Sequence, residues 1–118
     1  MIQIQVKNVF EGIHSYPEAP DEVAFLRVSH RHQFVVRTTI EVFSDDRELE
    51  FILVQRGIQK YVLTELGVDG TIDLQQHSCE WLAEFICDYI VRRYGGNRNV
   101  KVSVFEDDEN GAIVERYI

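Results

Sequence analysis

The feature that most constrains this chain is an unusually long run in which the side chains alternate between two faces. From Phe25 to Phe43, every second residue would lie on one side of an extended backbone: Leu26, Val28, His30, His32, Phe34, Val36, Thr38, Ile40 and Val42. Most of these side chains are apolar, and a period of two is typical of a β-strand with one buried face. The run therefore predicts one long strand over residues 25–43.

Two further regions repeat the same period. Residues 2–13 predict a strand that ends at His14, and a loop with two prolines separates it from the long strand. Near the C-terminus, residues 100–104 and 112–117 alternate on either side of a turn sequence at 109–111, which predicts a β-hairpin.

Two segments between these strands have the spacing of helices. Apolar residues recur every three or four positions over 51–66, and Gly67 follows as a plausible helix end. Ser78 can cap a second helix that stops before Gly95, while residues 68–77 look irregular.

The order of these elements, ββααββ, predicts an α+β fold. We expect a single domain over residues 1–118, built as an antiparallel four-stranded sheet with two helices on one face. The other face, with apolar residues on it, would need a partner, so we expect a homo-oligomer.

Charge and cysteine usage narrow the functional classes. The net charge is −8, which disfavours binding to nucleic acid or to an anionic membrane surface. Cys79 and Cys87 fall on one predicted helix too far apart to bridge, so both should be free thiols. No apolar signal or membrane segment is apparent, and a cytoplasmic location is expected.

The sharpest local signal is the pair His30 and His32, which project from the same face of the long strand. If the first two strands pair as a hairpin, His14 falls opposite this pair. Three imidazoles with one open position are a typical catalytic zinc site, and on an apolar face a metal would satisfy nitrogens that are costly to bury alone. We therefore predict a metal site, with zinc as the expected ion.

Five short segments resemble one known family. Residues 10–14 (FEGIH) look like its F-x-A-A-H segment, 30–32 (HRH) like its H-G-H, and 50–51 (EF) like the D-F that opens its first helix. Residues 78–80 (SCE) look like its T-x-E, and 102–106 (VSVFE) like its V-x-V-x-E strand. These segments are similar to those of the 6-pyruvoyltetrahydropterin synthase and 6-carboxytetrahydropterin synthase family, zinc-dependent enzymes that act on dihydroneopterin triphosphate.

The resemblance implies a tunnelling fold whose subunits join into a barrel, with ligand sites at subunit interfaces. It assigns His14, His30 and His32 to zinc, and it assigns Glu106 to the pterin, whose ring nitrogen and amino group a carboxylate can bind in parallel. Glu80 and Ser78 would belong to the same substrate site. Active members of this family are carbon–oxygen lyases.

The departures from the family fall on its proton-transfer residues. Leu26 stands where the family has a cysteine base, and Thr64 and Glu65 stand where it has an Asp-His pair. Glu65 is then the first substitute base, and Glu22 a second. Two functional classes stay open: a lyase with a non-cysteine base, or a metal-binding and pterin- or purine-binding homologue that is non-catalytic or purely structural.

Overall fold

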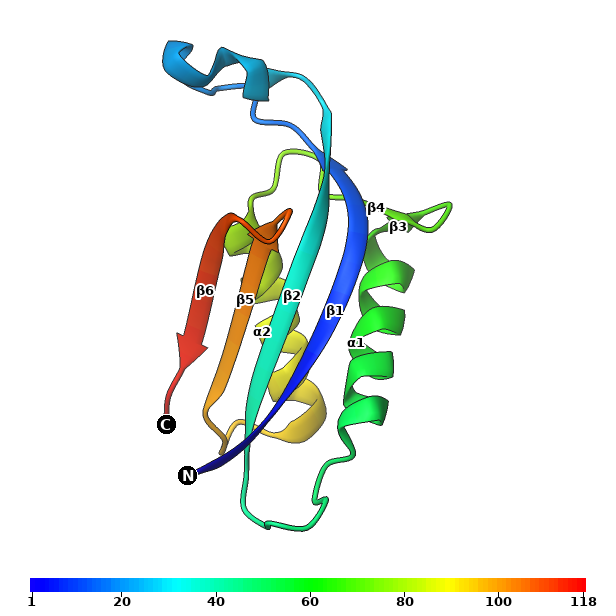
Figure 1. The fold of residues 1–118 in the computed structure, drawn as a ribbon, viewed down its shortest axis with the longest axis vertical. Helices are drawn as coiled ribbons and strands as arrows, with labels where there is room; N and C mark the ends of the chain where they lie inside the picture. The colour runs from blue at the N-terminus through cyan, green and yellow to red at the C-terminus, as the bar shows by residue number, and fades with distance from the viewer.

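A six-stranded mixed sheet forms the centre of the molecule (Figure 1), in a computed structural model that describes all of residues 1–118. The strand order is β3-β4-β1-β2-β5-β6, and every pairing is antiparallel except that of β1 with β4. The strands are β1 (Ile2–His14), β2 (His30–Val42), β3 (Gly67–Val68), β4 (Thr71–Asp73), β5 (Val100–Glu106) and β6 (Asn110–Arg116).

Two helices, α1 (Phe51–Leu66) and α2 (Cys79–Tyr94), cover one face of this sheet (Figure 1). Both helices and the even-numbered residues of β1 and β2 contribute to one core cluster, which includes Phe10, Phe34 and Ile86. The predicted α+β class, both helices and the C-terminal hairpin are confirmed. No helix is both long and apolar enough to cross a membrane.

The predicted four-stranded antiparallel sheet is wrong in its extent, because the segment between the helices adds β3 and β4. Ile72 of β4 is fully buried and pairs with Gly12 of β1 in the parallel direction. A strand of three residues is too short to produce a visible period of two, so the sequence pattern could not indicate it. The four long strands lie next to one another in the order β1-β2-β5-β6, and their pairings are antiparallel as predicted.

The second strand begins at His30 rather than at Phe25. Residues Asp21–Arg27 instead form a short 3-10 helix, η1, on an arm that extends beyond the sheet (Figure 1). Arg27 holds this arm in a turn, since its guanidinium donates to the carbonyl of Ala19 at 2.9 Å and to Asp21 at 2.7 Å. The sequence alternates between apolar and polar residues through this arm as well, but not because one face is buried, since Phe25 and Val28 are both exposed.

The face of the sheet opposite the helices is mainly polar. Gln5 donates to Thr39 at 3.1 Å, and Arg37 forms two hydrogen bonds with Asp108 at 2.8 and 3.1 Å. Two apolar side chains on this face, Val9 and Ile113, are nevertheless exposed, and the need for a partner on it stays a prediction.

Candidate metal centre

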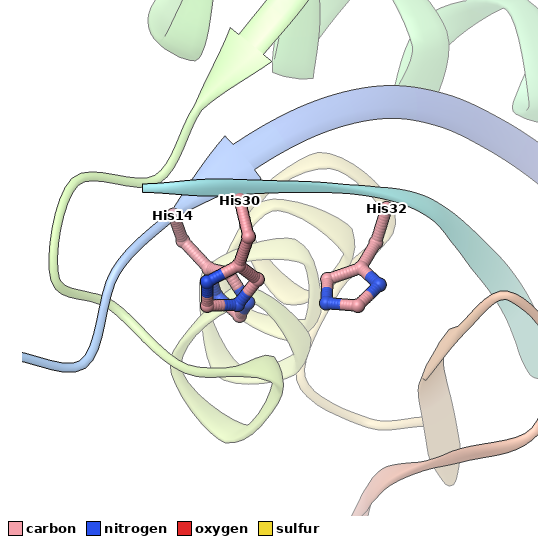
Figure 2. A group of neighbouring side chains, drawn as sticks. All are labelled: His14, His30 and His32. Atoms are coloured by element: carbon pink, nitrogen blue, oxygen red, sulfur yellow. The ribbon is translucent and has the colours of Figure 1, made fainter. Parts of the chain in front are cut away.

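The pairing of β1 with β2 brings three histidines together at one end of the sheet (Figure 2). His14 lies directly opposite His30, and Gly12 lies opposite His32, so all three imidazoles are on the helix-covered face. Their ring centroids are 4.6 to 5.5 Å apart. One ring nitrogen from each lies within 4.8 Å of the others, and this cluster could hold a metal ion. The predicted convergence of the three residues is therefore observed.

Each imidazole is oriented by an acceptor at its Nδ1 atom. The three contacts are His14 with the carbonyl of His77 at 3.1 Å, His30 with the carbonyl of Val28 at 2.8 Å, and His32 with a carboxylate oxygen of Asp107 at 2.7 Å. A neutral imidazole that donates through Nδ1 keeps its lone pair on Nε2. Metal-binding histidines in proteins are typically held in this way.

The carbonyl that orients His14 comes from the loop between β4 and α2. The backbone N–H of Ser15 donates to the carbonyl of Gln75 at 2.8 Å, and that of Leu74 donates to Ile13 at 3.0 Å. These bonds continue the parallel pairing of β1 with β4. Strand β4, which the sequence did not reveal, therefore positions the loop that carries the acceptor for the first histidine.

Asp107 reaches His32 from the tight turn between β5 and β6. Both Asp107 and Asp108 have positive φ angles, 53° and 56°, a conformation that aspartate adopts more readily than most residues. The Asp107 carboxylate also accepts the backbone N–H of Gln33 at 2.9 Å. That bond, followed by the bond from His32, lowers the pKa of Asp107, so the carboxylate stays ionised beside the imidazole.

Glu106 lies directly against the same cluster. Its Oε1 atom is 3.3 Å from His14 Nε2, and its Oε2 atom is 3.2 Å from His32 Nε2. His32 Nε2 nevertheless has no hydrogen-bond partner, because a carboxylate oxygen brings no hydrogen to a nitrogen that carries a lone pair. A proton or a metal ion at this point would satisfy both groups, so the donor set fits a cation.

Burial limits the charge that the cluster itself can carry. His14 is only 9% exposed, and its ring packs edge-on against Phe34 with centroids 5.3 Å apart. Desolvation lowers the pKa of His14, although the His77 carbonyl and the Glu106 carboxylate partly oppose this effect. His14 is therefore held in the neutral form, which is the form that binds metals.

A cavity of about 540 Å³ opens beside the cluster. His14 and His30 line it, together with three of the residues predicted for the ligand site: Ser78, Glu80 and Glu106. Leu26, from the arm, also lines this cavity.

Cys79 also lines the cavity, but it is not poised to react. Its Sγ atom lies 3.6 Å from Glu106 Oε1, the hydrogen-bond distance for a thiol. Burial and the nearby Glu106 carboxylate raise the pKa of Cys79 to about 12, so the sulfur remains a neutral thiol. Cys87 is likewise free and buried, and the prediction of two unpaired thiols is confirmed.

The residues proposed to replace the base lie elsewhere in the chain. Thr64 and Glu65 are exposed near the end of α1, and Glu22 is exposed in η1; none of the three lines the cavity. Within one chain, therefore, no predicted base faces the histidines. Asp107, which contacts His32, was not identified from the sequence. The available signal was its place in the turn that follows β5, the strand that pairs with β2.

No model of a known protein family matches the chain, and no curated protein matches it either. The residues of the site and their geometry are therefore what define it. By these criteria the chain is an α+β protein with a three-histidine cluster that could hold a metal ion beside a cavity of small-molecule size.

Proposed function

We propose that this protein binds one zinc ion through His14, His30 and His32, and that the adjoining cavity binds a pterin-like small molecule. The observation that carries this proposal is that one ring nitrogen from each of three histidines converges on the others, while the Nδ1 atom of each ring has a hydrogen-bond partner. Zinc binds neutral imidazole well and accepts four ligands. When bound, it supplies a Lewis acid that polarises a ligand oxygen.

The cavity supports the second half of the proposal. Its volume of about 540 Å³ lies in the range of small-molecule sites. Carboxylates of Glu80 and Glu106 and the hydroxyl of Ser78 line it, and these groups accept hydrogen bonds from the N–H groups of a pterin ring. The segments that resemble the tetrahydropterin synthases supply these same residues.

Binding without rapid turnover is favoured over lyase activity. Leu26 faces the cavity and cannot accept a proton, and no predicted substitute base lines the cavity. In the alternative, a lyase with a non-cysteine base, Glu65 or Glu22 could serve as that base only if it reached the cavity from a neighbouring subunit.

We expect the zinc-loaded protein to retain about one pterin per protomer after incubation with dihydroneopterin triphosphate. Conversion should be at most slow, since loss of a positioned base lowers rates by roughly 10²–10⁴. Mass spectrometry of the bound and free fractions measures both quantities, with metal-free protein as the control. Rapid multiple turnover would favour the lyase, and retention of no ligand would favour a structural metal.

We also propose that the protein is a homo-oligomer with its ligand sites near subunit boundaries. Strand β6 pairs only with β5, so its other edge has unpaired backbone groups available to a second sheet. We expect light scattering to give a mass that is a multiple of 13.8 kDa. A mass of one protomer across the micromolar range would contradict this expectation.

A further inference from the structure

The Glu106 carboxylate lies closer to the histidines than it would have to lie in order to bind a small molecule in the cavity. It is the last residue of β5, where it pairs with Phe34 of β2 and Asn110 of β6. Its two oxygens are divided between two imidazoles, one at 3.3 Å from His14 Nε2 and one at 3.2 Å from His32 Nε2. In this conformation no small molecule fits between the carboxylate and the cluster.

Each of these two distances, which involve different oxygens of the carboxylate, is the one expected between neighbouring ligands of one ion. Zinc–nitrogen and zinc–oxygen bonds are about 2.0–2.2 Å long, so two ligands at a tetrahedral angle lie roughly 3.3 Å apart. In their neutral forms, His14 and His32 donate their Nδ1 hydrogens elsewhere and present the Nε2 lone pairs toward Glu106. Lone pairs and carboxylate oxygens repel each other unless a cation lies between them.

Two neighbouring contacts of Glu106 support it as a ligand of the metal. Its backbone carbonyl accepts the N–H of Glu109 at 2.9 Å, which closes the hairpin turn and fixes the end of β5. The Cys79 thiol lies within hydrogen-bond distance of Oε1, so the carboxylate has an outer partner of its own, as metal-bound carboxylates commonly do.

We infer that Glu106 is the fourth metal ligand when no small molecule is bound. The resting site is then three histidines and one glutamate, without an open position. This inference rests on the proposed metal binding and changes the role assigned to Glu106. A small molecule that coordinates the metal must first displace this carboxylate. Only then can the carboxylate bind a pterin ring.

Cobalt(II) provides a direct test, because its visible absorption reports which atoms coordinate it. In the unaltered protein, added azide should leave the cobalt spectrum unchanged, since no position is open. In Glu106→Gln, the affinity for cobalt should fall by at least tenfold, and azide should shift the spectrum. Circular dichroism checks that the variant folds; if it does not, Glu106→Asp serves, because a shorter side chain withdraws the carboxylate from both nitrogens.

Two controls separate coordination from charge. Glu109→Gln removes the same charge from the same turn at an exposed position, and it should leave both the affinity and the azide response unchanged. Asp107→Asn removes the carboxylate that orients His32, so it should weaken cobalt binding without creating an azide response. An azide response in the unaltered protein equal to that of Glu106→Gln would overturn the inference while leaving the metal site intact. Failure of the unaltered protein to bind cobalt or zinc would overturn the proposed function itself.

Discussion

Replacing His32 with alanine is expected to remove most of the zinc from the purified protein. His32 Nε2 is a buried nitrogen without a hydrogen-bond partner, so its removal takes away a ligand and leaves only two imidazoles. Loss of an outer-shell partner alone typically weakens metal binding by 10–100-fold, so loss of a direct ligand should weaken it by more than about a hundredfold. Competition with a chromophoric chelator measures the affinity, and elemental analysis measures the zinc content.

Arg31→Ala is the matched control for this variant. Arg31 is the neighbouring residue on β2, but its side chain is exposed and lies on the opposite face of the sheet. Its replacement should leave the zinc content unchanged. The strand itself should persist in both variants because it is anchored by β1 and β5 on either side. An unchanged zinc affinity in His32→Ala would mean that the three histidines do not form the site.

Replacing Phe34 with alanine is expected to lower the free energy of unfolding by about 3–5 kcal/mol, the usual loss for a fully buried phenylalanine. Its ring is 0% exposed and lies edge-on to both His14 and His32. The ring also fills the space beside Gly12, where even a methyl group would lie 2.7 Å from the Phe34 ring.

Urea denaturation of the metal-free protein measures this loss without the added stability that a bound ion provides. Phe25→Ala is the control, because it deletes the same side chain from a position that is 72% exposed, and it should change stability by less than about 0.5 kcal/mol. Equal losses in the two variants would show that the core beneath the histidines is not organised as described.

Much of the fold follows from patterns that are local in the chain. The even-numbered apolar residues of β1 and β2 indicated which face is buried, and Ser78 does cap α2, where its hydroxyl accepts the backbone N–H of Trp81 at 3.2 Å. The histidine cluster was predictable for the same reason: two residues two apart on a strand share a face, and a hairpin places a third opposite them.

The features of the fold and the site that the sequence did not predict depend on contacts that do not affect the pattern of side-chain types along the chain. His77 and Val28 serve the cluster through backbone carbonyls, and any residue type could supply such a group. Strand β4 is defined by its pairing with a distant strand rather than by its own three residues. In the sequence, Asp107 is one of several acidic residues in a charged turn, and only the position of that turn next to β2 shows its contact with His32.

The distribution of the site along the chain has a consequence for the order in which it is assembled. All three histidines belong to one hairpin, whereas the acceptors of His14 and His32 lie 63 and 75 residues away in sequence. Pairing within a hairpin is rapid, and closing long loops is slower. We therefore expect the imidazoles to gather first during folding and to become oriented last. The proposed ion-binding geometry should be complete only when the C-terminal hairpin has docked, so metal uptake is expected to mark the end of folding.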